Sequence, residues 1–156
     1  MSPNIHVDIP GRGTLRLRHL LLDFNGTLAR DGYLIRGVGQ RLERLRKKLW
    51  IEVLTADTFG TARRALARSG VPVTIVGSGA DKLARLRALG ADGVTAIGNG
   101  RNDLAMFKAA ALSICVVGPE GACTETLAAA DLAAPDIATA LDLLLYPERL
   151  IASLRE

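Results

Sequence analysis

Short apolar runs and amphipathic stretches alternate along this chain. The apolar runs occupy residues 19–24, 50–55, 71–76, 94–97 and 112–117. Continuous apolar runs of this length are typical of strands buried on both faces of a sheet. Helical periodicity separates them, over residues 38–48, 58–69, 80–89 and 102–110. A repeated strand–helix pattern predicts an α/β fold: a three-layer, Rossmann-like parallel sheet with helices on both faces.

The ends of the chain add smaller elements to this pattern. Residues 5–17 alternate around a Pro-Gly-Arg-Gly turn at 10–13, which predicts an N-terminal β-hairpin. After the last apolar run we expect a helix over 119–130, an edge strand over 131–133, a helix over 137–145 and a short amphipathic helix in the tail, 148–156. Neither a linker nor a repeat interrupts the pattern, so we expect a single domain over 1–156.

Composition narrows the class of protein. The chain is 49% hydrophobic but only 4% aromatic, so its core must be built from small aliphatic side chains. No apolar run is long enough to span a membrane and the first residues do not have the pattern of a signal peptide, so we expect a cytoplasmic protein with no membrane partner. Cys115 and Cys123 lack the spacing of a zinc or redox motif, and we interpret them as structural thiols.

The net charge of +4 raises the question of a nucleic-acid partner. Ten of the 20 basic residues lie in three helical segments, around 41–48, 63–68 and 85–87, and neither stacking aromatic residues nor a nucleic-acid-binding motif accompanies them. Solvated helix faces explain this distribution better. We therefore expect no nucleic-acid partner, although the positive field would favour phosphate substrates.

Polar residues gather where the predicted strands end. They form four groups, Asp23 to Thr27, Thr55 to Asp57, Gly77 to Lys82 and Gly98 to Asp103. The carboxyl ends of parallel strands meet at one edge of a sheet, which is where such sheets bind ligands. A carboxylate, a hydroxyl, an ammonium and an amide–carboxylate pair are the groups needed to hold a phosphoryl group and Mg²⁺.

The order and the sequences of these four groups resemble the motifs of a known family. LLLDFNGTLA, VLTAD, the Lys82 region and IGNGRNDLAM are similar to the four motifs of the haloacid dehalogenase superfamily. Within that superfamily, the segments DFNGT, LTADTFGT and GNGRND most resemble the motifs of the soluble relatives of P-type ATPases. The resemblance covers roughly residues 18–145 and leaves out the hairpin and the tail.

The resemblance implies catalytic roles for three residues. Asp23 would be the nucleophile, forming an aspartyl-phosphate, and also a metal ligand. Thr55 would donate its hydroxyl to a phosphoryl oxygen, and Lys82 would offset the negative charge. Each has a simpler alternative: Asp23 can open a turn before Asn25-Gly26, Thr55 can simply close a strand, and Lys82 can be a solvated surface residue.

The resemblance also implies binding roles. The substrate would lie against Asn25, Gly26 and Thr27 after the first strand and against Ala56 and Asp57 after the second. Mg²⁺ would be held by Asp23, Asn25, Asn99 and Asp103. An alternative for Asp103 is that it caps the helix that follows, as Asn102 could too.

Two residues depart from the family pattern. Most phosphatases of this superfamily have a second Asp two residues after the nucleophile, as general acid and base, and Asn25 occupies that position here. An amide cannot exchange a proton near neutral pH, which typically costs roughly 10² to 10⁴ in rate, so we expect a slow or selective enzyme. Asn99 replaces a metal-binding Asp of many relatives, which predicts weaker Mg²⁺ binding.

Spacing excludes a cap domain. The intervals from Asp23 to Thr55 and from Thr55 to Lys82 are largely filled by one helix and one strand each. Relatives without caps act on large substrates with exposed phosphates or complete the cleft with a second subunit. Residues 33–35 could form a small flap over the site, and apolar positions in the tail indicate self-association into a homo-oligomer.

Three hypotheses follow. The first is a capless, Mg²⁺-dependent phosphohydrolase, including weak ATPase activity, that acts on a small molecule or on an exposed macromolecular phosphate. The second is a phosphate-binding or regulatory protein that keeps the fold and Asp23 without useful turnover. The third is a nucleic-acid-binding surface beside an incidental site.

Overall fold

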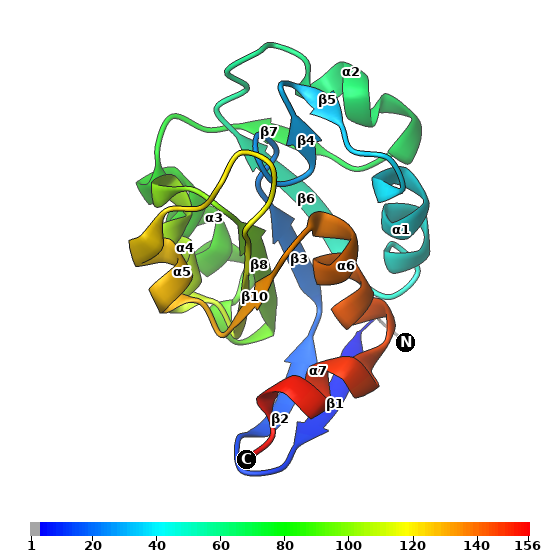
Figure 1. Ribbon diagram of the computed structural model, residues 1–156, viewed down its shortest axis with the longest axis vertical. Helices are drawn as coiled ribbons and strands as arrows, with labels where there is room; N and C mark the ends of the chain where they lie inside the picture. Colours follow the sequence, from blue (N-terminus) through cyan, green and yellow to red (C-terminus); the bar gives the residue numbers. More distant parts are fainter. Residues whose placement is uncertain (1–3) are drawn as a thin grey trace.

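The computed structural model describes residues 4–156, and its centre is a six-stranded sheet (Figure 1). The strand order is β10-β9-β8-β3-β6-β7, and every neighbouring pair is parallel. The strands are β3 (His19–Leu22), β6 (Trp50–Thr55), β7 (Val73–Ile75), β8 (Val94–Gly98), β9 (Leu112–Val116) and β10 (Leu132–Ala134). This confirms the predicted parallel sheet and places β3, the strand that leads to Asp23, in its interior.

Helices cover both faces of the sheet, as the pattern predicts. One face carries α1 (Val38–Leu45), α2 (Ala62–Leu66) and α6 (Ile137–Leu145); the other carries α3 (Gly79–Leu89), α4 (Leu104–Ala109) and α5 (Thr124–Ala129). Successive residues of β3 point to opposite faces, so Leu20 and Leu22 pack in the larger core and Leu21 in the smaller one. All three are fully buried, which is why this strand reads as a continuous apolar run.

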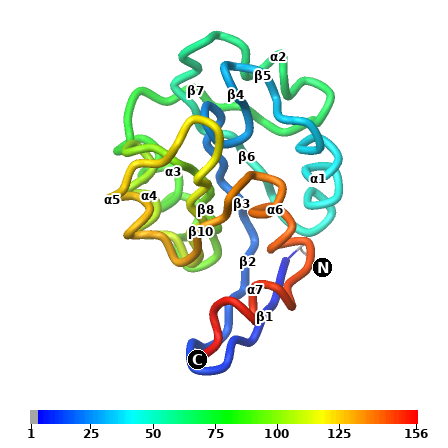
Figure 2. The backbone as a smooth tube through the Cα atoms, viewed as in Figure 1, coloured from blue at the N-terminus to red at the C-terminus, as the bar shows by residue number. Residues whose placement is uncertain are grey.

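The predicted N-terminal hairpin is present and packs against the tail. β1 (Ile5–Ile9) pairs antiparallel with β2 (Gly13–Leu17), and α7 (Pro147–Leu154) lies beside them (Figures 1 and 2). Ile5, Val7, Ile9 and Leu150 are buried. The two ends of the described chain therefore extend the larger core beyond the sheet.

Two predicted helices begin later than the pattern suggests. The helix expected from residue 58 begins at Ala62, because Asp57 and Gly60 take positive φ angles of 51° and 67° and form a turn. It continues as a 3₁₀ turn, η1 (Ala67–Ser69). The helix expected from residue 119 begins at Thr124, because the chain first turns at Gly121, whose φ is 74°. Two further 3₁₀ turns, η2 (Ala91–Gly93) and η3 (Arg101–Asp103), precede β8 and α4.

A small flap follows β3. It consists of β4 (Ala29–Arg30) and β5 (Tyr33–Leu34), joined by a turn in which Asp31 has a φ of 51°. This overlaps the flap predicted over 33–35. Residues 23–82, all of them described, contain no cap domain between the motifs.

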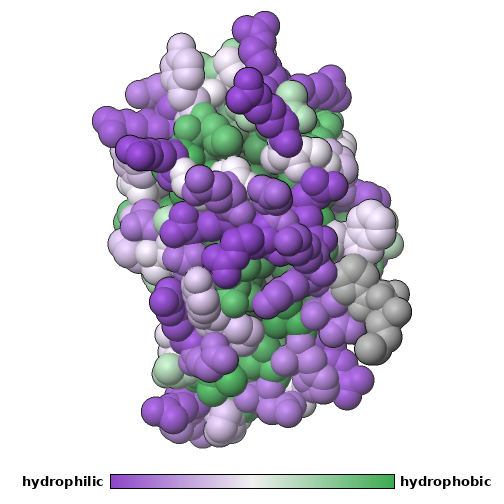
Figure 3. Space-filling view, turned by 90° about the vertical axis from the view of Figure 1, so that its right-hand side faces the viewer, coloured by the Kyte–Doolittle hydropathy of each residue, from purple (hydrophilic) through white to green (hydrophobic). Residues whose placement is uncertain are grey.

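The surface that carries α1 is mostly hydrophilic, with smaller apolar areas (Figure 3), as expected if basic residues of that helix face solvent. Within residues 4–156 no helix is long and apolar enough to cross a bilayer. Both cysteines are free thiols, and burial raises the pKa of Cys115 to about 11.

Candidate active site

A buried ammonium group joins two of the predicted strand ends. The Nζ of Lys82 lies 2.9 Å from Oδ1 of Asp23 and 2.8 Å from Oδ1 of Asp103. The Lys82 side chain is fully buried, Asp103 is fully buried, and Asp23 is 6% exposed. The alternative of a solvated Lys82 is therefore wrong, and the first, third and fourth motifs meet at one point.

The backbone around Lys82 explains how a lysine reaches this position. Ser78 caps α3 by accepting from the N–H of Asp81 at 3.3 Å, so Lys82 lies one turn inside the helix. A Cβ at Gly79 would lie 2.8 Å from the carbonyl oxygen of Asn102. Glycine thus lets the start of α3 approach the loop that carries Asp103.

Burial and the neighbouring charges shift the pKa values of Asp23 and Lys82. Burial and then the charge of Asp103 raise the pKa of Asp23 to about 7, although Lys82 opposes the shift. Burial disfavours the charge on Lys82, but the two carboxylates outweigh it and raise the pKa of Lys82. With both carboxylates ionised the triad carries one uncompensated negative charge, which a further cation would balance.

Asp103 also holds its own loop together. Its Oδ2 accepts from the N–H groups of Asn99 and Gly100, both at 3.0 Å. A Cβ at Gly98 would collide with the Asp103 carboxylate, so this strand end needs a glycine. The carboxylate thus receives three donors, which suits a residue that positions Lys82 and the loop.

Thr27 connects the first motif to the fourth. Its buried hydroxyl lies 3.2 Å from Oδ1 of Asn99 and 3.5 Å from Oδ2 of Asp23. The Asn99 amide donates to the carbonyl of Gly121 at 3.1 Å. Gly26 has a φ of 76°, and a Cβ there would collide with the Asn99 side chain. Asn99 is therefore fixed by contacts on both sides of the site.

The second motif lies on the neighbouring strand. Thr55, at the end of β6, is 1% exposed, and its hydroxyl accepts from the N–H of Asp57 at 2.9 Å. Asp57 accepts from the N–H groups of Thr61 and Ala62, both at 3.0 Å, so it caps α2. Ala56 is exposed. Substrate contacts for Ala56 and Asp57 stay predictions.

The oxygens at the site fit a weakly held divalent cation. The described residues contain no group of three His, Cys, Asp or Glu side chains arranged to hold a metal. However, Oδ1 of Asn25 is buried without a hydrogen-bond partner, and Oδ2 of Asp23 lies at the long distance of 3.5 Å from the Thr27 hydroxyl. Mg²⁺ usually keeps several waters and takes one or two carboxylates from the protein, so this set suits it.

Three polar contacts around the site were not predicted. The buried Thr126 hydroxyl donates to the carbonyl of Gly100 at 2.9 Å, and Thr61 donates to the carbonyl of Gly32 in the flap at 2.7 Å. The N–H of Asp31 donates to Glu120 at 3.3 Å. No local pattern marks these residues, because their partners lie 26 to 89 positions away.

Comparison with known proteins defines the family. Residues 72–133 match the model of the haloacid dehalogenase-like hydrolases. Together with the parallel sheet and the four motif ends, this shows that the chain belongs to the haloacid dehalogenase superfamily. The narrower resemblance to soluble relatives of P-type ATPases stays a prediction.

The chain is also similar to individual proteins. The uncharacterised protein MJ0073 of Methanocaldococcus jannaschii is 42% identical over 85 residues, covering 50% of this chain and 91% of that protein. The 3-deoxy-D-manno-octulosonate 8-phosphate phosphatase of Moraxella catarrhalis, solved with magnesium, phosphate and its sugar, superposes with a TM-score of 0.71 at 19% identity, covering 89% of this chain and 94% of the other. A phospho-aspartyl intermediate analogue of phosphoserine phosphatase gives 0.63 at 15% identity, covering 82% and 99%. At these identities the structural likeness establishes the shared fold.

Proposed function

We propose that this protein is a phosphohydrolase that forms an aspartyl-phosphate on Asp23. The observation that carries the proposal is the buried Lys82 ammonium, held at 2.9 Å from Asp23 and 2.8 Å from Asp103. Burying three charged groups together costs stability, so a structural role alone is a weak explanation. A nucleophilic carboxylate beside a fixed cation is the arrangement that phosphoryl transfer needs.

The first step is transfer to the protein. A carboxylate oxygen of Asp23 attacks phosphorus, the bond from phosphorus to the leaving oxygen breaks, and the leaving group departs with the electron pair. Lys82 offsets the charge of the carboxylate and of the phosphoryl group. Thr55 supports the same step, because its hydroxyl accepts from the N–H of Asp57 and its own proton is left to donate to a phosphoryl oxygen.

The second step returns Asp23. Water attacks the phosphorus of the aspartyl-phosphate, the bond to the Asp23 oxygen breaks, and inorganic phosphate and a proton are released. Asn25 has no carboxyl group with which to take that proton or to protonate the first leaving group. Both steps therefore rely on water for proton transfer, which predicts slow turnover and a long-lived phosphoenzyme.

The metal of the proposed site is Mg²⁺. Asp23 and the unpartnered amide oxygen of Asn25 would hold it, with Asn99 beside them and Asp103 orienting the loop. Bound there, it would neutralise charge on the phosphoryl oxygens. The Moraxella phosphatase solved with a magnesium ion supports this assignment. Because amide ligands carry no charge, we expect weak binding, with millimolar Mg²⁺ needed to fill the site.

Substrate preference follows from the proton argument. Some leaving groups need little protonation, such as the ADP of ATP, the carboxylate of an acyl phosphate or an aryl oxide. Asn25 should slow their departure less than it slows the departure of an alkoxide. The absence of a cap domain among residues 23–82 favours large substrates with an exposed phosphate; a small molecule would fit a cleft completed by a second subunit. Phosphoserine phosphatase, solved as a phospho-aspartyl intermediate analogue, supports the covalent route.

Intact-mass spectrometry tests the proposal. The protein is incubated with Mg²⁺ and acetyl phosphate, and separately with ATP, for the wild type and for Asp23→Asn. We expect a phosphoryl adduct in the wild type that Asp23→Asn abolishes. Asp92→Asn is the matched control, because Asp92 is exposed and pairs only with Arg18, and it should leave the adduct unchanged.

The alternative is a phosphate-binding or regulatory protein. It predicts no adduct and no phosphate release, but an increase in melting temperature with inorganic phosphate or Mg²⁺. An adduct that persists in Asp23→Asn would contradict the nucleophile assignment.

Asn25→Asp provides a separate prediction on activity. Restoring a carboxyl group two residues after the nucleophile should raise turnover of alkyl phosphates by roughly 10² or more, since it supplies the missing acid and base. The rate of adduct formation from acetyl phosphate should rise less, because its leaving group needs no proton, whereas hydrolysis of the adduct should become faster with both substrates. Rapid-quench measurement of adduct formation with both substrates measures the difference; equal gains in that step would contradict the proton-transfer argument.

A further inference from the structure

A hollow beside the flap combines an exposed tyrosine with an unpaired arginine. It lies between β5 and α2, which contact each other, and its volume is about 290 Å³ (Figure 1). The residues that line it are Gly32, Tyr33, Leu34, Thr61, Arg64 and Ala65. We call it the flap hollow. Sites for small molecules typically measure roughly 300–1,000 Å³, so this hollow is large enough for one end of a ligand.

The flap hollow lies close to the candidate active site. A β-bridge joins Asn25, two residues after Asp23, to Ala29, and Ala29 pairs with Leu34. Neighbouring strands lie roughly 4.8 Å apart, so these two steps place Leu34 within roughly 10 Å of Asn25. A substrate with its phosphoryl group at Asp23 can therefore reach the hollow with the far end of its leaving group.

Contacts between the flap and the neighbouring loops hold the walls of the hollow. The Thr61 hydroxyl donates to the carbonyl of Gly32 at 2.7 Å. A Cβ at Gly32 would lie 3.0 Å from the Cβ of Phe59, so this glycine lets the flap approach the loop after β6. On the other side, the N–H of Asp31 donates to Glu120. Because the chain's own contacts fix the hollow, a ligand need not order it.

Two exposed aromatic side chains lie at the flap, in a chain that has few. The sequence contains six aromatic residues, one Trp, two Tyr and three Phe. Tyr33 is 77% exposed, and Phe59 is 52% exposed. Large rings gain most from burial, so the open ring of Tyr33 on the wall of the hollow is suited to stack against a flat group of a ligand.

The charge of the hollow favours an anion. Residues 58–80 contain Arg63, Arg64 and Arg68 and no acidic residue. Arg64 is exposed on the wall of the hollow, and no described residue forms an ion pair or a hydrogen bond with its side chain. A guanidinium group without a carboxylate partner is suited to bind phosphate oxygens.

The chemistry at Asp23 adds a third requirement. Asn25 supplies no proton, so the leaving group must be stable as an anion. A nucleoside diphosphate meets all three requirements. It leaves as an anion, it carries phosphates for Arg64, and its flat base is separated from the transferred phosphorus by two phosphates and a sugar.

We infer that the substrate is a nucleoside triphosphate and that the flap hollow binds its base and sugar. An oxygen of Asp23 attacks the terminal phosphorus, the bond from that phosphorus to the bridging oxygen breaks, and the nucleoside diphosphate departs with the electron pair. Tyr33 stacks on the base, and Arg64 pairs with a phosphate of the leaving group. The hollow provides this second contact on the same chain, in place of a cap domain or a second subunit. The inference rests on the proposed phosphohydrolase function.

Phosphate release from three substrates tests the inference. ATP has a base, a sugar and three phosphates, inorganic triphosphate has the phosphates alone, and acetyl phosphate has no phosphate in its leaving group. With Mg²⁺ present, we expect kcat/KM to be about tenfold higher for ATP than for inorganic triphosphate, the usual effect of one stacked base.

Variants of Tyr33 test the stacking contact. Tyr33→Ala should lower kcat/KM for ATP about tenfold and leave the values for the other two substrates unchanged. Tyr33→Phe keeps the ring and should retain the wild-type values. Trp50→Ala is the matched control, because Trp50 is 68% exposed but lies at the opposite end of β6 from Thr55; it should change none of the three values.

Arg64→Gln tests the phosphate contact. It should lower kcat/KM about tenfold for ATP and for inorganic triphosphate, because both have phosphates in the leaving group, and it should leave acetyl phosphate unchanged. Arg68→Gln is the control, since it makes the same change of charge outside the hollow and should leave all three values unchanged.

Three results would overturn the inference. One is an equal kcat/KM for ATP and inorganic triphosphate. Another is a loss in Tyr33→Ala that is the same for all three substrates, which would show a general effect on the flap. The third is an equal effect of Arg64→Gln and Arg68→Gln, which would show a general effect of charge. Release from acetyl phosphate without a preference for ATP would remove this inference alone; no release from any substrate would remove the proposed function as well.

Discussion

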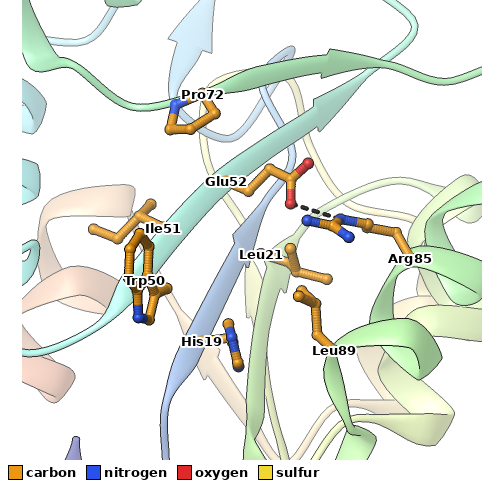
Figure 4. A pocket seen from close by; sticks show the side chains of 8 residues that line it. All are labelled: His19, Leu21, Trp50, Ile51, Glu52, Pro72, Arg85 and Leu89. Atoms are coloured by element: carbon orange, nitrogen blue, oxygen red, sulfur yellow. Dashed lines mark hydrogen bonds and ion pairs between the residues drawn. The ribbon is translucent and has the colours of Figure 1, made fainter. Parts of the chain in front are cut away.

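The two ends of β3 and β6 differ in the burial and the charge of their side chains. At the carboxyl end, Asp23 and Asp103 share the buried ammonium of Lys82, and charges are packed where the chain could have placed aliphatic residues. At the amino end, Trp50 is 68% exposed beside an open cavity, and Nδ1 of His19 is buried without a partner (Figure 4). At the carboxyl end the charged groups are buried and interact strongly with one another. At the amino end the side chains are more exposed and interact weakly.

The two ends therefore differ in how strongly their charged groups interact. The carboxyl end packs three charged groups out of water, and contacts such as those of Asp103 and Thr27 fix the surrounding loops. At the amino end the ion pair of Arg85 with Glu52 is partly exposed, so substitutions there should have smaller effects. Four variants test this contrast.

Lys82→Met should have the largest effect. The variant leaves Asp23 and Asp103 buried together without a cation, and removing one partner from a buried ion pair typically costs about 3–5 kcal/mol. Urea unfolding at pH 8 measures the loss. Lys108→Met is the control, since Lys108 is exposed on α4, and it should change stability by about 0.5 kcal/mol or less. Equal effects would show that the triad does not contribute to stability.

Asp23→Asn should stabilise the protein, in a pH-dependent way. The pKa of Asp23 is raised from 3.8 to about 7 in the folded state. Below about pH 4 the carboxyl is protonated in both states and costs nothing. Between pH 4 and 7 the folded state holds the proton that the unfolded state loses, so wild-type stability falls as pH rises, and above pH 7 the full cost is present.

An amide at position 23 removes that cost. We expect Asp23→Asn to exceed the wild type by on the order of 2 kcal/mol at pH 8 and by little at pH 4, in thermal or urea unfolding with EDTA present. A difference that does not change with pH would contradict the raised pKa. The expected gain accompanies loss of the phosphoryl adduct, so stability and function are opposed at this residue.

Gly26→Ala should have an intermediate effect. Gly26 has a φ of 76°, and a Cβ there would collide with the Asn99 amide. Gly60 is the matched control, because its φ is 67° and a Cβ there would meet nothing within 4 Å. Both variants should lose about 1 kcal/mol from backbone strain, and Gly26→Ala about 1 kcal/mol more. Equal losses in chemical denaturation would show that the loop moves away without cost.

Much of the fold could be predicted because its signals are local. A strand buried on both faces must be apolar at every position, so β3, β6, β8 and β9 were recognisable within a few residues of their observed ends. Helix starts were less predictable. Asp57 lies beside the amphipathic stretch that suggested a helix from residue 58, but its carboxylate caps a helix that begins at Ala62.

The residues of the candidate site could be predicted from the sequence, but their contacts could not. The rule that parallel strand ends converge placed Asp23, Thr55, Lys82 and Asp103 together. Whether Lys82 faced solvent or the interior stayed open, because its partners lie 59 and 21 positions away. The cavity between His19 and Trp50 could not be predicted, because these two residues are only the beginnings of two apolar runs in the sequence.

His19→Phe should have the smallest effect on stability, and its sign distinguishes the two ends. Phenylalanine keeps a ring at the start of β3 but replaces the buried, unpartnered Nδ1 by carbon. An unsatisfied buried polar atom costs about 1–3 kcal/mol, and fitting the larger phenylalanine ring in place of the imidazole offsets part of the gain, so we expect a gain of at most about 1 kcal/mol. His6→Phe should be neutral, because His6 is exposed. Destabilisation by His19→Phe would mean that Nδ1 has a partner in solution, and the stability of the amino end would then depend on its polar contacts just as that of the carboxyl end does.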